Sequence, residues 1–140
     1  MISSSLIWIA LGGAFGAITR YAVSLIVGYP YGTLTVNIVG SFLMGLLFIY
    51  LNQKGLDRWQ PLLLIGLLGG FTTLSAFSLD TFKLYEDGRL MMAGIYVFAS
   101  VFLSLIALII GLWGIIYYPV KRKFKSLRKK SSEDNKIERD

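Results

Sequence analysis

The stretch GGFTTLSAFS, residues 69–78, decides how the rest of the chain is interpreted. It lies inside an apolar run, residues 62–82, that is long enough to cross a membrane, since roughly 20 helical residues span about 30 Å of hydrocarbon. Two glycines and two β-branched threonines in succession are poor helix formers. Non-helical backbone at this depth is tolerated only where it is buried in protein or lines an aqueous cavity. The sequence therefore predicts a transmembrane helix that is broken at mid-membrane.

Three more apolar runs flank this one, at residues 6–27, 32–51 and 91–118. The connections between the runs are short, and all three prolines lie at the boundaries of the runs, where a missing N–H is tolerated. The chain is 55% hydrophobic, with a mean hydropathy of +0.64. The first run is too long for a signal peptide and no basic residue precedes it, so it is expected to be retained. The fold class predicted is an all-α integral membrane protein with four transmembrane helices.

The basic charge is concentrated after the last run. Residues 121–140 hold nine of the fourteen Lys and Arg residues and four of the eight acids. Because positive charge stays on the cytoplasmic side, the C-terminus is expected in the cytoplasm, and four spans place the N-terminus there too. The chain is thus divided into a membrane domain, residues 1–120, and a frayed or disordered basic tail, residues 121–140, against the anionic lipid of the cell membrane. No nucleic-acid-binding face is predicted.

Several chemistries are excluded by composition. The chain has no Cys and no His, which removes thiolate chemistry and the usual soft-metal ligands. Arg20 and Asp80 are expected near the ends of their spans, and no charged residue is expected near the middle of any span. Proton relays and membrane hydrolases need titratable or nucleophilic groups there, so the sequence argues against an enzyme.

Polar residues inside the spans form stripes. Asn37 and Ser41 are one helical turn apart, and Tyr96, Ser100 and Ser104 repeat every four residues on one face. Such residues either bond within their own helix and pack against a neighbour, or line a path through the protein. The sequence alone leaves both interpretations open.

The glycines and the broken segment also have two interpretations. The glycine pairs at 12/16 and 66/70 are typical of close helix packing. At the break, freed carbonyls could coordinate a hard cation such as Na⁺, and hydroxyl or N–H groups could face an anion.

Three segments resemble the signature sequences of one family. GGAFGAITRY (12–21), GTLTVNIVGSFLMG (32–45) and GLLGGFTTLSAFSLD (66–80) are similar to those of the Fluc, or CrcB, fluoride channels, in the same order and spacing. The resemblance implies a passive, fluoride-selective channel that lowers cytoplasmic fluoride. It also implies an antiparallel dual-topology-type dimer, either a homodimer or a heterodimer with a homologous subunit.

The resemblance also implies roles for individual residues. Backbone carbonyls of Gly69 and Thr72 would hold a structural Na⁺ at the dimer centre. Arg20 would lie in the pore vestibule. The fluoride pore would be lined by the side chains of Asn37, Thr73, Ser75, Phe77, Tyr96, Ser100 and Ser104.

The chain departs from the family pattern at two positions. Leu74 replaces a phenylalanine, so one electropositive ring edge is missing, and Asp80 replaces a glutamate. Leu74 and the basic tail favour one alternative, an accessory subunit of a heterodimeric channel that is inactive alone. A small four-helix multidrug exporter is a separate alternative. The exporter normally uses a carboxylate in the first span, and this first span has none.

Overall fold

The computed structural model describes the backbone of residues 2–137 and the side chains of residues 5–114. Over this range the chain is helical. The elements are α1 (Ile2–Val27), α2 (Tyr31–Lys54), η1 (Asp57–Trp59), η2 (Pro61–Leu68), α3 (Gly69–Phe71), α4 (Leu74–Glu86) and α5 (Leu90–Ile137). Four segments are long and apolar enough to cross a membrane: Ser5–Val27, Tyr31–Lys54, Asp57–Glu86 and Leu90–Gly114. The four predicted spans are confirmed.

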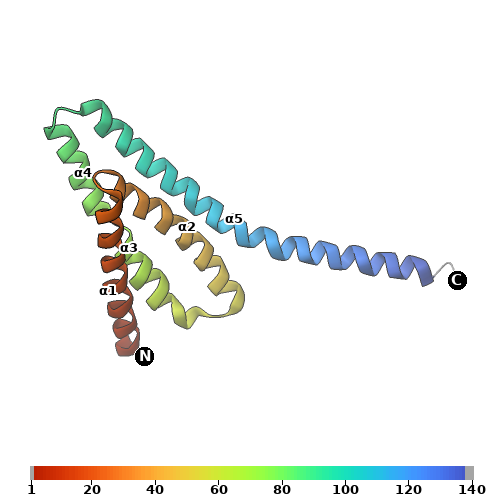
Figure 1. The fold of residues 1–140 in the computed structure, drawn as a ribbon. Helices are drawn as coiled ribbons and strands as arrows, with labels where there is room; N and C mark the ends of the chain where they lie inside the picture. Colours follow the sequence, from red (N-terminus) through yellow and green to blue (C-terminus); the bar gives the residue numbers. More distant parts are fainter. Residues whose placement is uncertain (1, 138–140) are drawn as a thin grey trace.

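The helices are paired side by side (Figure 1). The α1 helix packs along η2 and α3 and runs in the same direction. The contacts show this direction, since Gly12 lies against Leu62 and Gly16, one turn later, lies against Leu67. In the same way α2 runs parallel to α5, with Gly45 against Leu108. The start of α1, the α2–η2 connection and the end of the last apolar segment therefore share one end of the bundle. The 28–30 and 87–89 connections lie at the other end.

The break in the third span is confirmed, and it is narrower than the sequence predicts. Of the four residues expected to interrupt the helix, only the two threonines leave it. Gly69 is helical at φ −64° and ψ −35°, whereas Thr72 (−80°, 155°) and Thr73 (−156°, 122°) are extended. Before the break, η2 is a π-helix, a form that is usually found near functional sites.

Close backbone packing explains the glycines. A Cβ on Gly16 would lie 2.1 Å from the Leu67 carbonyl oxygen, and one on Gly70 would lie 2.6 Å from the Gly13 carbonyl oxygen. A Cβ on Gly111 would lie 2.2 Å from the Phe42 carbonyl oxygen. These distances are below any van der Waals contact, so only glycine lets these helix backbones approach so closely.

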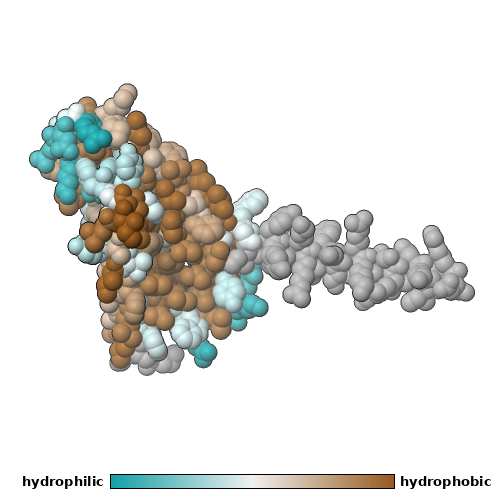
Figure 2. Space-filling view, in the orientation of Figure 1, coloured by the Kyte–Doolittle hydropathy of each residue, from teal (hydrophilic) through white to brown (hydrophobic). Residues whose placement is uncertain are grey.

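The outer surface is apolar between two polar ends (Figure 2). Large apolar side chains are exposed along α1 and the first half of α5, including Leu6, Leu11, Phe15, Ile18, Phe98, Phe102 and Ile106. A surface of this composition is suited to lipid or to another subunit. The chain is therefore a multi-pass membrane protein.

The fourth helix extends beyond its apolar part. α5 continues through Pro119 to Ile137, in a segment for which the sequence predicts frayed or disordered chain. Lys, Arg, Leu and Glu are good helix formers, which accounts for the helical backbone. The side chains of the tail lie outside the described residues.

Candidate functional site

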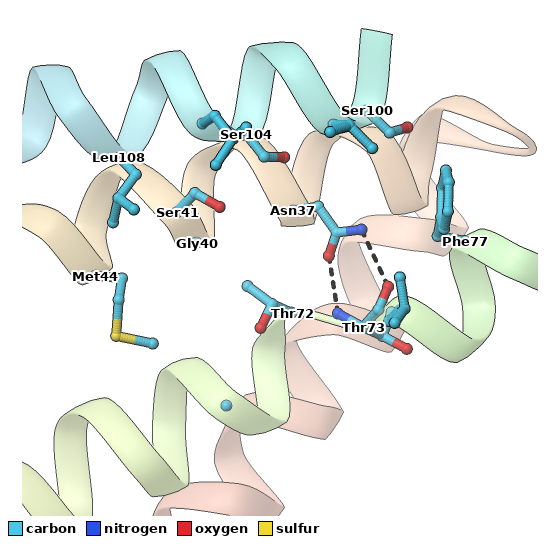
Figure 3. Close-up of a pocket in the computed structure, with 14 residues that line it drawn as sticks. Asn37, Gly40, Ser41, Met44, Thr72, Thr73, Phe77, Ser100, Ser104 and Leu108 are labelled. Atoms are coloured by element: carbon cyan, nitrogen blue, oxygen red, sulfur yellow. Dashed lines mark hydrogen bonds between the residues drawn. The ribbon is translucent and has the colours of Figure 1, made fainter. Parts of the chain in front are cut away.

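The break is held open by one side chain of α2. The Asn37 amide nitrogen donates to the Thr73 carbonyl oxygen at 3.0 Å, and the Asn37 amide oxygen accepts from the Thr73 N–H at 2.8 Å (Figure 3). The Thr73 hydroxyl then caps α4 by accepting from the Ala76 N–H at 3.2 Å. An unpaired backbone N–H or C=O group in hydrocarbon costs on the order of several kcal/mol. These hydrogen bonds therefore make the interruption of the helix tolerable.

Two carbonyls beside the break lose their helical donors. In a continuous α-helix the Gly69 carbonyl would accept from the Thr73 N–H, and the Thr72 carbonyl from the Ala76 N–H. Both of these N–H groups are bonded elsewhere, to Asn37 and to the Thr73 hydroxyl. Gly69 and Thr72 are the two residues expected to supply carbonyl ligands for a hard cation. The described residues contain no cluster of His, Cys, Asp or Glu that could hold a metal ion, so these carbonyls are the metal-ligand candidates.

A cavity of about 610 Å³ lies beside the break, between α2, the third span and α5. Figure 3 shows Ser100 and Ser104 on one face of α5, across the same space from Thr72 and Thr73, with Asn37 between them. The cavity is lined by Asn37, Gly40, Ser41, Met44, Gly69, Thr72, Thr73, Leu74, Phe77, Ser100, Val101, Ser104, Leu105 and Leu108. Among these side chains there is no charge.

The hydroxyls of the α5 stripe (Tyr96, Ser100 and Ser104) differ from most others in the helices. Five other Ser and Thr side chains donate to the carbonyl four residues earlier, namely Thr19, Thr35, Thr72, Ser78 and Thr81. In contrast, the buried hydroxyl oxygens of Tyr96, Ser100 and Ser104 have no hydrogen-bond partner among the described residues. Buried polar groups are nearly always satisfied, so three in a row indicate a position for water or an ion. The path interpretation is thereby favoured for this stripe, and the packing interpretation for the other five.

Asn37 satisfies both interpretations at once. It joins α2 to the broken segment, and it also lines the cavity. Its amide carries two N–H groups, and one bond to Thr73 leaves the second N–H available as a donor.

Phe77 lines the cavity, and Tyr96 packs against it from behind without lining the cavity. Their rings stack with centroids 5.7 Å apart and planes 22° apart, and both belong to a buried cluster with Leu84 and Ala93. Leu74, one turn before Phe77, is 75% exposed and lines the cavity. An aromatic ring at that position would have room.

Arg20 and Ser75 lie in a second cavity of about 400 Å³. It is also lined by Thr33 and by Thr73, which is the only predicted site residue that lines both cavities. The Ser75 hydroxyl lies 3.1 Å from the Thr73 hydroxyl. The predicted site residues are thus divided between two cavities that meet at Thr73, except Tyr96, which lines neither cavity.

One buried polar contact, between the Asp80 carboxylate and the Thr33 hydroxyl, was not predicted from the sequence. Asp80, expected at the end of its span, is buried six residues before the end of α4, and the Thr33 hydroxyl donates to its carboxylate at 2.5 Å. The Tyr29 hydroxyl donates to the Asp80 carbonyl at 3.2 Å. A charge-assisted bond this short stabilises a buried carboxylate. The available signal was topological: the second span begins at the end of the bundle where the third span finishes.

The arrangement can bind a small anion through neutral donors. Hydroxyl and amide groups can replace the water around an ion without a buried cation that would hold it too tightly. Neutral groups line the first cavity, and Arg20 is the one charged residue in the lining of the second cavity.

Comparison with known proteins extends over this whole region. The family described as CrcB-like protein, Camphor Resistance (CrcB), matches residues 7–112. This range includes all the lining residues of the first cavity and all those of the second. A protein of Cereibacter sphaeroides named fluoride-specific ion channel FluC is 51% identical over 115 residues, 78% of this chain and 92% of its own length. Proteins with the same name from Paracoccus denitrificans (50% over 109 residues, 74% and 88%) and Photobacterium profundum (46% over 112 residues, 74% and 88%) are also similar.

Proposed function

Because this chain belongs to the CrcB family, we infer that it is a fluoride channel and not an enzyme, and we propose that it lets fluoride leave the cytoplasm passively. The names of its relatives support fluoride as the transported ion. The exporter alternative is not favoured by any relative described above.

The observation that carries this proposal is the row of unpartnered hydroxyls on α5. Tyr96, Ser100 and Ser104 present three buried O–H groups without partners among the described residues, and Ser100 and Ser104 line the same cavity as Asn37. Fluoride is small and strongly hydrated, so it needs a donor at each step of its path. A series of weak neutral sites lets the ion both enter and leave.

A structural Na⁺ fits the two carbonyls that have lost their donors. We propose Gly69 and Thr72 as its ligands in each subunit, with a second set from the partner subunit. Carbonyl oxygens suit a hard cation, and one chain supplies too few of them for a complete shell. The ion would stabilise the break together with Asn37.

A second subunit would complete the channel. The cavity next to the break is open at the surface of this chain, and the neighbouring faces of α5 are apolar and exposed. An antiparallel partner, either a second copy or a homologue, would cover that opening and place two broken segments together.

The orientation follows from charge. Lys54 and Arg58 lie at the end of the bundle where the last apolar segment finishes, and the sequence after that segment holds nine basic residues; Lys83 and Arg89 lie at the other end. We therefore propose that the tail lies in the cytoplasm.

Leu74 supports a second candidate function, an accessory subunit that is inactive alone. Its exposed aliphatic side chain leaves only Phe77 to offer an aromatic edge in this segment. Such a subunit would share a pore with a homologue that supplies the second ring.

Fluoride efflux tests both candidates. Liposomes containing the purified full chain are loaded with potassium fluoride, and release is followed with a fluoride electrode after valinomycin removes the voltage limit. Rapid fluoride release with chloride retained supports the channel. No release alone, but release with an oppositely oriented homologue, supports the accessory subunit. Release equal to that of protein-free liposomes in both experiments would contradict both.

A further inference from the structure

Two tryptophans and an arginine form a cluster at the end of the bundle that carries the N-terminus. The Trp8 and Trp59 rings lie 6.3 Å apart at 52°, and the Arg58 guanidinium carbon lies 5.7 Å from the centre of the Trp59 ring. These three side chains and Leu62 line a cavity of about 280 Å³, which is separate from the two cavities at the break. The cluster joins the first span to the start of the third.

The polar groups of this cluster have no acceptors among side chains 5–114. No described carboxylate lies within ion-pair distance of Arg58; its neighbour Asp57 accepts instead from the Gln60 amide at 2.7 Å. Neither indole N–H donates to a described residue. The exposed guanidinium and the two indoles therefore present a group of donors and one positive charge to the same opening.

The position of the cluster corresponds to the membrane–water interface. Trp59 lies two residues before Pro61, where the π-helix begins, and tryptophan is enriched at the level of lipid headgroups. Toward the bundle centre the neighbouring surface is apolar and exposed at Leu11 and Ile65, where acyl chains would lie. An occupant of the cavity would thus have a polar head beside an apolar body.

The sign of the charge selects the occupant. Arg58 lies in the α2–η2 connection, Lys54 is the last residue of α2, and the basic tail follows the apolar segment that ends at the same end of the bundle. Guanidinium binds phosphate through two parallel N–H bonds, and basic residues at this depth attract anionic lipid. The ring of Trp59 holds the guanidinium in place through a cation–π contact.

We propose that Trp8, Arg58 and Trp59 bind the phosphate of an anionic phospholipid in the leaflet at the N-terminal end of the bundle. The bound lipid would fasten the first span to the start of the third at the interface. This site does not depend on the fluoride path, so it stands or fails independently of the proposed function.

Tryptophan quenching by brominated lipid tests the site. The full chain, in a Trp113→Phe background so that only Trp8 and Trp59 emit, is reconstituted with phosphatidylglycerol or phosphatidylcholine brominated on the acyl chains. Phosphatidylglycerol should quench more strongly, and Arg58→Gln should reduce this preference about fivefold, as expected for one basic residue near an anionic surface. Arg58 is exposed, so its replacement leaves the packing intact.

Arg89→Gln is the matched control, because Arg89 lies at the opposite end and the tail is the same in every variant. It should keep the full preference. Equal quenching by the two lipids in the wild-type sequence, or an unchanged preference in Arg58→Gln, overturns the proposal. Loss of the preference on addition of inorganic phosphate at unchanged ionic strength also overturns it, because the occupant would then be a free anion.

Discussion

The side-chain amide of Asn37 bonds both backbone groups of Thr73, the N–H at 2.8 Å and the carbonyl at 3.0 Å. Thr73 is the residue at which the third span changes direction and the residue that lines both cavities. One amide therefore fixes the position of the break, of the α4 N-terminus and of the meeting point of the cavities.

Asn37→Ala should remove this support and the free N–H donor together. We expect fluoride efflux to fall by about tenfold or more, equivalent to about 1.4 kcal/mol in the barrier, and stability to fall by about 1–3 kcal/mol for the unsatisfied backbone groups. Efflux from liposomes and thermal unfolding in detergent measure the two effects. Asn52→Ala is the control, because the exposed Asn52 amide donates to the Phe48 carbonyl of its own helix, accepts from the Gln60 amide at 3.4 Å and lines neither cavity. Undiminished efflux in Asn37→Ala would show that Asn37 is not part of the path.

Ser100→Ala should separate transport from stability. Its hydroxyl is buried without a partner among the described residues, so its removal should leave the free energy of unfolding unchanged or raise it by about 1 kcal/mol. Fluoride efflux should nevertheless fall, because a donor of the path is lost. The control is Ser78→Ala, whose hydroxyl bonds the Leu74 carbonyl; it should leave efflux unchanged. Equal efflux from both variants would contradict a transport role for Ser100.

Gly45→Ala should disrupt the contact between α2 and α5. The added Cβ would lie 2.3 Å from the Leu108 carbonyl oxygen, so the helices must separate, at a cost of about 1–3 kcal/mol for an overpacked site. The yield of monodisperse protein and its melting temperature should both decrease. Gly94→Ala, where no atom lies within 4 Å of the added Cβ, should be neutral or stabilising. A Gly45→Ala variant with the yield and melting temperature of the wild-type sequence would contradict this packing of α2 against α5.

Leu74→Phe should raise fluoride efflux from liposomes that contain this chain alone. The side chain is 75% exposed in the cavity, so a ring fits without a clash and adds an electropositive edge near the path. Leu103→Phe is the control, since Leu103 is also exposed but lines neither cavity. If fluoride efflux of both variants equals that of the wild-type sequence, Leu74 no longer supports the accessory-subunit candidate.

Replacement of Na⁺ by a large organic cation should lower both efflux and melting temperature. The Gly69 and Thr72 carbonyl oxygens would then lose the Na⁺ ion that they are proposed to coordinate. The N–H groups that would pair with them in a continuous helix stay bonded to the Asn37 amide and the Thr73 hydroxyl. Lithium and potassium serve as size controls, and fluoride efflux is compared at constant ionic strength. Identical behaviour in all four salts would count against a sodium site.

Patterns of single residues predicted most of the fold and the α5 stripe. The spans follow from apolar length, and the shared face of Tyr96, Ser100 and Ser104 follows from their four-residue spacing. The placement of the break did not follow, because helix propensity treats glycine and threonine alike as poor formers. In the structure Gly69 and Gly70 are helical, and only Asn37, which is 36 residues distant in sequence from Thr73, determines where the backbone opens.

Asp80 shows a second limit of sequence interpretation. A carboxylate at the end of an apolar run is normally assigned to the interface, so its burial depends on a partner that the run does not contain. That partner, Thr33, belongs to the preceding span. Contacts between spans, rather than the composition of either span, decide whether such a group faces water.

The glycine contacts also determine how the molecule can deform. They join α1 to η2 and α3, and α2 to α5, through backbone atoms that cannot separate without opening a whole helix interface. The α4 helix contains no glycine and is fixed by hydrogen bonds, from Asn37 at its start and from Thr33 and Tyr29 near Asp80. Hydrogen bonds can be exchanged with water or a passing ion, whereas backbone contacts cannot. In mechanical terms, the stiffness of this protein is unevenly distributed: two helices line both cavities, and of these α2 is joined to α5 by glycine contacts whereas α4 is not joined in this way.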